Sequence, residues 1–139
     1  MGGLICWEHW MPMARQKLHA SGEQIHIAQW PWVKEMSLVA SRHYAFEGRC
    51  FVLACGSLLR AHSLPEELEI PPQLISAPSQ LVLRGGSAII GPDGTILGGP
   101  LMDASEILFA DLELDRIWEE SMTMDVAGHY NRPDIFGSV

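Results

Sequence analysis

Cys6 is the residue of this chain best suited to covalent chemistry. It ends the apolar run from Gly2 to Cys6, and the polar pair Glu8 and His9 follows closely. The run has no helical period and begins with glycine, which is typical of a buried strand. In open α/β sheets, ligands bind where such strands end and the chain turns toward a helix. We therefore predict that Cys6 is a nucleophile, with its thiolate as the reactive form and the backbone N–H of Trp7 available to bind an oxyanion.

Other roles for the cysteines stay open at this point. Most cysteines in soluble proteins are small buried hydrophobes, so Cys6 could be a packing residue. Cys50 and Cys55 suit that role better, because they lie five residues apart in or at the end of an apolar strand and so face opposite sides. Cys6 and His9 could also form a thiol–imidazole pair or supply two zinc ligands. Because neither a Cys-x-x-Cys nor a His-Glu-x-x-His spacing occurs, we expect no metal site and no cofactor.

Four tryptophans gather near the ends of the first two predicted strands and could line an apolar pocket beside Cys6, although core or interface packing is an equal alternative. They are Trp7, Trp10, Trp30 and Trp32. Trp7, Trp30 and Pro31 are the neighbours that we expect nearest to a bound substrate or oxyanion. Lys34 follows the second strand closely enough to be a site candidate, but a solvated surface position is the favoured interpretation for it.

A strand, helix, strand, helix, strand alternation must position these residues, and it predicts an α/β layered fold. After the first strand, Pro12 suits the first turn of a helix that Gly22 can end. A second helix presents one apolar face from Met36 and stops near Gly48, and we expect that face to pack on the sheet. The expected later strands are Gln24–Trp30 and Cys50–Ala54, and the helix face consists of Met36, Val39, Ala40, His43 and Tyr44.

The second half of the chain differs in character. Ser63–Gln80 holds four prolines and is expected to be a loop, whereas Ala88–Leu97 is predicted to be a hairpin that turns at Pro92-Asp93-Gly94. Beyond the hairpin we expect a strand over Glu106–Leu114, a short helix capped by Asp115 that runs to Met122, and an irregular tail from Gly128 to Phe136 around Pro133.

Composition restricts the class of protein. A chain of 139 residues has the length of one domain. Its 17 acidic and 9 basic residues give a net charge of −8, which disfavours nucleic acid and membrane surfaces as partners. No apolar run approaches the roughly 18 residues of a membrane span, and no basic segment of a signal peptide is visible. Three cysteines are an odd number, so we expect a reducing, cytoplasmic location without a disulfide scaffold.

The segment Gly2-Gly3-Leu4-Ile5-Cys6-Trp7-Glu8-His9-Trp10-Met11-Pro12 resembles the nucleophile segment of the nitrilases, in the carbon–nitrogen hydrolase superfamily. The resemblance continues through Gln29-Trp30-Pro31, through Ser41 to Cys50, and into Gly128 to Asp134. The Cys-Trp-Glu string and the His-Tyr-x-Arg-Pro-Asp tail are more similar to the nitrile-cleaving branch than to the amidases.

This resemblance implies an α-β-β-α sandwich with a mixed sheet, and a cysteine nucleophile assisted by a glutamate base and a lysine. Only Cys6 can be carried over, because the family's Glu and Lys lie upstream of the cysteine strand. Glu8, Glu47, Lys17 and Lys34 match other parts of the family pattern. We therefore expect residues 1–139 to be a single, N-terminally truncated carbon–nitrogen hydrolase domain, corresponding to the C-terminal half that carries the nucleophile.

The resemblance also implies the reaction: hydrolysis of a small-molecule nitrile to a carboxylic acid and ammonia, through a thioimidate and then a thioester. A nitrile-hydrating or amidase-like relative is the first alternative, because the shared tetrahedral intermediate can release an amide instead. The other alternative is a truncated, non-catalytic fragment or an assembly module of a nitrilase oligomer, since the complete proteins form homo-oligomers. We expect the chain by itself to be inactive, because two of three catalytic groups are missing.

Overall fold

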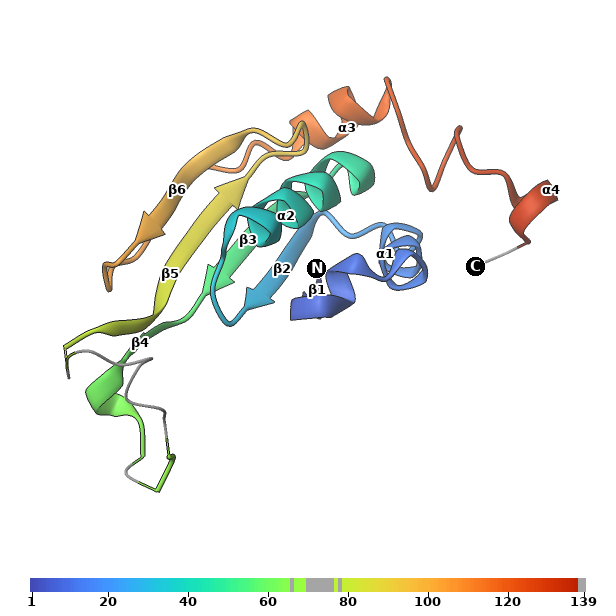
Figure 1. Ribbon diagram of the computed structural model, residues 1–139. Helices are drawn as coiled ribbons and strands as arrows, with labels where there is room; N and C mark the ends of the chain where they lie inside the picture. Colours follow the sequence, from blue (N-terminus) through green and yellow to red (C-terminus); the bar gives the residue numbers. More distant parts are fainter. Residues whose placement is uncertain (66, 70–76, 78, 138–139) are drawn as a thin grey trace.

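The first half of the chain forms a parallel sheet connected by helices (Figure 1). The computed structural model describes residues 1–65, 67–69, 77 and 79–137. Strand β1 is followed by a 3₁₀ helix, and helices α1 and α2 then connect the three strands in turn, as parallel neighbours require. The elements are β1 (Gly2–Ile5), the 3₁₀ helix (Cys6–Trp10), α1 (Pro12–His19), β2 (Ile25–Trp30), α2 (Glu35–Gly48) and β3 (Phe51–Gly56).

The second half adds antiparallel strands and two short helices. A tight turn at residues 91–95 joins β5 to β6, and Gly94 adopts a φ of 78°, so the predicted hairpin is confirmed. The elements are β4 (Leu58–Arg60), a 3₁₀ turn (Ala61–Ser63), β5 (Leu81–Ile90), β6 (Ile96–Met102), α3 (Asp115–Ser121) and α4 (Pro133–Phe136). The last helix lies away from the sheet (Figure 1).

The six strands of the described residues belong to one mixed sheet, in the order β1-β2-β3-β5-β4, with β6 also paired to β5. The pairs β1–β2 and β2–β3 are parallel, whereas β5 runs antiparallel to β3, β4 and β6. The predicted α/β class with a mixed sheet is therefore confirmed. Among the described residues, no helix combines the length and the apolar character needed to cross a bilayer.

The hydrophobic core lies between this sheet and helix α2. Alternate residues of β2 and β3 face the helix, among them Ala28, Trp30 and Val52, and all three are buried. From α2, Ala40 and Tyr44 pack against them. The strands therefore present period-2 alternation, with one closed face and one face that is only half-buried.

Strand β1 forms as predicted, but the prediction that it is buried is wrong. Its residues alternate between half-buried and exposed, and Ile5 is 65% exposed. β1 occupies an edge of the sheet, where β2 is its one partner within the described part of the chain. An apolar run predicts a strand but does not say how many layers cover it.

The predicted buried face of α2 is also wrong in part. Met36 and Val39 are exposed, and so is His43, whereas Ala40 and Tyr44 are buried as expected. The face that contacts the sheet is rotated by about one residue and consists of Ala40, Ser41, Tyr44 and Ala45. Small residues on this face let the helix approach the strands closely, so the larger apolar side chains did not mark the buried side.

Three predictions for the later segments need correction. Glu106–Leu114 forms no strand, because its alternating burial is accompanied by no ladder partner among the described residues. Helix α3 has the expected extent, but Leu114 occupies the cap position and Asp115 lies inside the first turn without a side-chain cap bond. Pro133 begins α4 instead of lying in an irregular tail. Half of the residues in the loop predicted for Ser63–Gln80 lie outside the described residues.

Candidate active site

Cys6 occupies a sharp turn between β1 and the 3₁₀ helix. Its φ of 51° lies in the left-handed region, which a residue with a Cβ atom adopts at a cost of about 1 kcal/mol or more. The side chain is half-buried and packs against the edge of the core. A strained turn of this kind sets a thiol apart from the regular strand that precedes it, which is how a nucleophile is presented to a pocket.

A cavity of about 440 Å³ opens beside Cys6. The residues singled out from the sequence meet there: Cys6, Trp7, Trp10, Trp30, Pro31, Trp32 and Lys34 line it, together with Met36, Ser37, Val82 and Leu83. Trp30 is buried and its Nε1 donates to Ser41 Oγ at 3.0 Å, whereas Trp7 is 77% exposed. Trp30 thus forms a fixed wall, and Trp7 lies at the open side of the cavity.

Trp32 and Lys34 reach the cavity because the segment after β2 is fastened to β5. Val33 N donates to the Gly85 carbonyl at 2.9 Å, and Gly86 has a φ of 86° with Val33 O only 2.5 Å from where a Cβ would stand. Only glycine allows this approach. Lys34 Nζ lies 4.6 Å from the centre of the Trp32 ring, a cation–π contact.

The two polar residues after Cys6 hold the turn instead of flanking the thiol. The backbone N–H of Ile5 donates to Glu8 Oε2 at 2.7 Å. His9 is buried, its Nδ1 lies 2.9 Å from the Cys6 carbonyl oxygen, and its Nε2 lies 3.1 Å from His26 Nε2. Both ring nitrogens are therefore engaged by groups other than the thiol. The described residues contain no cluster of ligands that could hold a metal ion.

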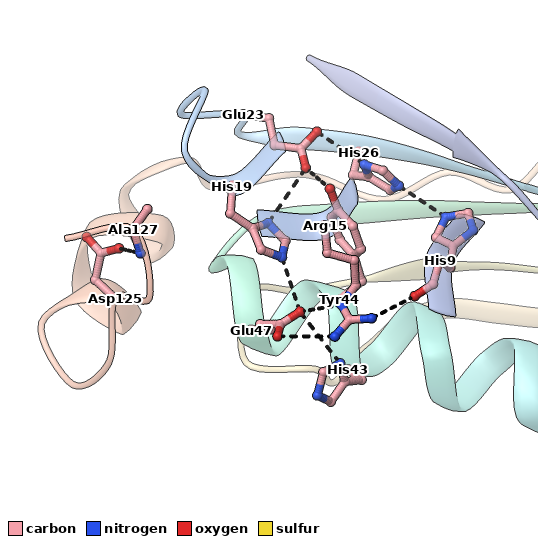
Figure 2. A network of polar contacts seen from close by, with 10 residues as sticks. All are labelled: His9, Arg15, His19, Glu23, His26, His43, Tyr44, Glu47, Asp125 and Ala127. Atoms are coloured by element: carbon pink, nitrogen blue, oxygen red, sulfur yellow. Dashed lines mark hydrogen bonds and ion pairs between the residues drawn. The ribbon is translucent and has the colours of Figure 1, made fainter. Parts of the chain in front are cut away.

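A buried polar network lies behind this turn, and sequence reasoning missed it (Figure 2). His26 Nδ1 contacts Glu23 Oε2 at 3.1 Å, and Tyr44 donates its hydroxyl to the other oxygen of Glu23. No sequence motif joins these histidines, because His9, His19 and His26 belong to different elements. The available signal was the period of β2, because His26 alternates with Ala28 and Trp30 on the buried face of that strand.

Arg15, His19 and Glu47 form a second part of the network, between α1 and α2 (Figure 2). Arg15 Nε donates to Glu47 Oε2 at 2.6 Å, and His19 Nε2 lies 3.3 Å from the same oxygen. Arg15 Nη1 also donates to the His9 carbonyl oxygen at 3.2 Å, which links this part to the Cys6 turn. The two helices and the turn are thus joined by charge-assisted hydrogen bonds.

The pKa values of these groups follow from burial and partners. Burial alone would raise the pKa of Glu47, but hydrogen bonds from His19 and Arg15 and the arginine charge lower it to about 2. The same competition lowers the pKa of Glu23, through His26 and Tyr44. Burial and the Glu23 carboxylate raise the pKa of Tyr44. For His9, burial lowers the pKa more than the Cys6 carbonyl raises it.

The other two thiols are poorer candidates for reactivity. Cys50 is fully buried and burial strongly raises its pKa; burial also raises the pKa of Cys55, on the other side of the sheet. Neither residue lines the cavity beside Cys6. All three cysteines are free. The structure thus offers one half-buried thiol in a strained turn at a cavity with tryptophan walls.

A sequence profile decides the family of this chain. The profile of the carbon–nitrogen hydrolases matches residues 1–119. The chain belongs to the carbon–nitrogen hydrolase family. A nitrilase of Bradyrhizobium diazoefficiens is 39% identical to this carbon–nitrogen hydrolase over 136 residues, which are 98% of the chain and 42% of that protein. An aliphatic nitrilase of Sinorhizobium fredii is 36% identical, over 98% of this chain and 44% of its own length.

A bifunctional nitrilase/nitrile hydratase of Lupinus angustifolius is 34% identical, over 100% of this chain and 41% of its own length. The chain therefore spans less than half the length of each of these relatives. Solved structures agree in fold: the carbon–nitrogen hydrolase of Helicobacter pylori superposes with a TM-score of 0.70 at 20% identity, over 96% of this chain and 46% of that one. The NitFhit protein of C. elegans gives a TM-score of 0.65 at 19% identity, with 96% and 29% coverage.

Proposed function

We propose that this chain is the nucleophile-bearing part of a nitrilase, which hydrolyses a small-molecule nitrile to a carboxylic acid and ammonia. The observation that carries the proposal is the half-buried thiol of Cys6 in a left-handed turn beside a cavity with tryptophan walls. The thiolate adds to the nitrile carbon to give a thioimidate. A first water expels ammonia and leaves a thioester, and a second water releases the acid and returns the thiol. The apolar rings would receive the organic part of the substrate, with Trp7, Trp30 and Pro31 nearest to the reacting carbon.

The base and the lysine that assist this chemistry are proposed to come from sequence outside residues 1–139. Within the chain, the Glu8 carboxylate accepts the Ile5 N–H, and Glu47 is held by Arg15 and His19 in the network away from the cavity. Neither carboxylate is free to activate a thiol and two waters. Residues 1–139 would then be the C-terminal part of one truncated domain, with a second sheet and helix layer supplied by the remainder.

A second product is the main alternative within this chemistry. The tetrahedral intermediate can release an amide if its carbon–sulfur bond breaks before ammonia leaves, and the matched protein of Lupinus angustifolius is named a bifunctional nitrilase/nitrile hydratase. An assembly module of a nitrilase homo-oligomer is the alternative without chemistry. The three free cysteines suit a reducing compartment, and the cytoplasm is the location that we propose.

Turnover tests this proposal directly. Ammonia and amide release from benzonitrile, a short aliphatic nitrile and an arylacetonitrile would be measured for the chain alone and for the chain co-expressed with the uncovered part of the Bradyrhizobium diazoefficiens nitrilase. General-base help is worth about 10²–10⁴ in rate and an oxyanion donor about 10²–10³, so the chain alone should remain at background and the pair should turn over. Cys6→Ala should abolish that turnover, with Cys55→Ala as the matched control. Turnover that survives Cys6→Ala would contradict the proposal.

A further inference from the structure

An unbroken line of buried contacts runs from the Cys6 backbone into the protein. The Cys6 carbonyl oxygen contacts His9 Nδ1, His9 Nε2 contacts His26 Nε2, and His26 Nδ1 contacts Glu23, at 2.9, 3.1 and 3.1 Å. Tyr44 completes the line at the second oxygen of Glu23. His9, His26 and Tyr44 are at most 1% exposed, and Glu23 is 6% exposed. Such a line stabilises a structure only when each contact holds a proton.

Counting protons fixes the tautomer of His9. A carbonyl oxygen can only accept, so His9 must carry its proton on Nδ1. The contact between the two Nε2 atoms then needs one further proton, and the contact between His26 Nδ1 and Glu23 needs a third. Two neutral imidazoles and a carboxylate supply only two protons. The three contacts therefore need one additional proton between His9 and Glu23. Whether it lies on His26 or on the Glu23 carboxyl group, His9 keeps its own proton on Nδ1, directed at the Cys6 carbonyl oxygen.

This line of contacts can hold Cys6 in its left-handed conformation. Its φ of 51° is unfavourable for a residue with a side chain, so some contact must offset the cost. His9 is fixed from three sides: its ring is stacked on Trp30 with centroids 4.6 Å apart, its Nε2 contacts His26, and its own carbonyl accepts from Arg15. The fixed ring directs Nδ1 at the Cys6 carbonyl and leaves the thiol on the side of the cavity.

We propose that His9, held by His26 and Glu23, is a positioning residue for the Cys6 nucleophile. It donates from Nδ1 to the Cys6 carbonyl oxygen and keeps Cys6 in the left-handed conformation that presents its thiol to the tryptophan cavity. The inference rests on the proposed role of Cys6, and it concerns backbone conformation, which can be measured without turnover. It assigns His9 no proton transfer to or from substrate.

The protonation pattern can be tested on the unmodified chain. Nitrogen-15 NMR of the histidine-labelled protein should show His9 protonated on Nδ1 and not on Nε2. Resonances would be assigned with His9→Gln and His26→Asn. A His9 ring protonated on Nε2 alone cannot donate to the Cys6 carbonyl, and this result would overturn the proposal.

A cycle of substitutions tests the conformational claim. Glycine adopts a positive φ freely and alanine does not, so the chain with Cys6→Gly should melt at a higher temperature than the chain with Cys6→Ala. His9→Gln can reach His26 but loses the donor at the Nδ1 position, whereas His9→Asn keeps that donor. The difference in melting temperature between the Cys6→Gly and Cys6→Ala chains should become smaller when His9→Gln is added and should persist when His9→Asn is added. An equal difference in all three backgrounds would show that His9 does not hold the turn.

Kinetics of the co-expressed enzyme provide a separate measurement. A positioning role predicts that His9→Gln lowers kcat on the order of tenfold with KM nearly unchanged, and that His9→Asn recovers part of the loss. A rise in KM at constant kcat would instead make His9 a substrate-binding residue and overturn the proposal. If the unmodified enzyme shows no turnover, the proposed function fails, whereas the melting and NMR measurements still decide the role of His9.

Discussion

The two faces of the sheet differ in how completely they are closed. On the face beneath α1 and α2, Ala28, Val52 and Ile90 are fully buried, and the buried side chains of His9, His26 and Glu23 contact one another. On the opposite face, Ile27 and Leu53 are half-buried, and a cavity of about 290 Å³ separates β3 and β5 from residues 106–108.

This difference distinguishes the side chains that support the proposed nucleophile, Cys6, from the surface that would be needed to complete the proposed site. The groups that fix the Cys6 turn come from the closed layer and lie within the described residues: His9 from the 3₁₀ helix, His26 from β2, and Arg15 from α1. The opposite face has apolar side chains directed at solvent, with Phe109 83% exposed. We infer that the chain positions its thiol by itself but relies on further sequence to cover the sheet and assist catalysis.

Substitutions on α2 give the largest expected effect on the closed face. Ala40→Asp would place a carboxylate against Trp30 and Val52 without a partner, which should destabilise the protein by roughly 3–5 kcal/mol. Val39→Asp, one residue earlier on the exposed side, should stay within about 0.5 kcal/mol. Urea denaturation followed by circular dichroism measures both. Equal effects would mean that α2 does not present the described face to the sheet.

The labelling rates of the three thiols test whether the cysteine in the turn is more reactive than the cysteines on the two faces of the sheet. Cys6 should react with iodoacetamide first, Cys55 on the open face second, and Cys50 last, because burial raises the pKa of the latter two and Cys50 has no exposure. We expect a difference of about 10²-fold between Cys6 and Cys50. Peptide mapping after timed labelling gives the three rates. Faster labelling of Cys50 or Cys55 in the folded chain would refute the assignment of Cys6.

The fold of the first half could be predicted from the sequence because local signals and tertiary structure agree there. Pro12 begins α1, Gly22 adopts a φ of 73° after it, and the apolar runs on either side become strands. The hairpin could also be predicted, because Pro92-Asp93-Gly94 is a sequence typical of a tight turn. The buried face of α2 could not be predicted in the same way. Ala40, Ser41 and Ala45 are buried because they are small, whereas hydrophobicity favoured Met36 and Val39 as the buried residues.

The candidate site shows a similar division. Cys6, the tryptophans and Lys34 could be grouped because strand ends in a parallel sheet meet at one edge. The line from His9 to Tyr44 could not, because it joins a 3₁₀ helix, a turn, a strand and a helix whose contacts depend on tertiary packing. Polar residues that are paired in a core look like surface residues in a sequence.

Low pH should lower the free energy of unfolding because Glu47, at the contact between α1 and α2, becomes protonated. Its pKa is lowered to about 2 in the folded protein, so it contributes stability above its unfolded pKa, near 4.5, and loses that contribution as pH falls toward 2. Glu47→Gln should lower stability at pH 7 by roughly 2–3 kcal/mol and flatten the decline between pH 5 and pH 2. Urea midpoints over this range provide the measurement. An unchanged acid dependence would show that the contacts with Arg15 and His19 carry no net stabilisation.

The smallest effect on stability is expected on the open face. Ile107 and Phe109 are 77% and 83% exposed, so replacing both with serine should change the stability of the chain by less than about 0.5 kcal/mol. If the remainder of a nitrilase domain covers this face, the same double substitution should nevertheless weaken association with the co-expressed segment, because apolar area of that interface is lost. Val39→Ser is the matched control, since it removes an exposed apolar side chain from the other layer.

Association would be measured by co-purification and by recovery of ammonia release. Loss of both with the double substitution, and neither with Val39→Ser, would support an incomplete sheet face as the docking side. Normal association of the doubly substituted chain would show that the side chains of Ile107 and Phe109 take no part in completing the domain. The cavity beneath Leu108 would then be an open groove of this chain and not an interface that further sequence fills.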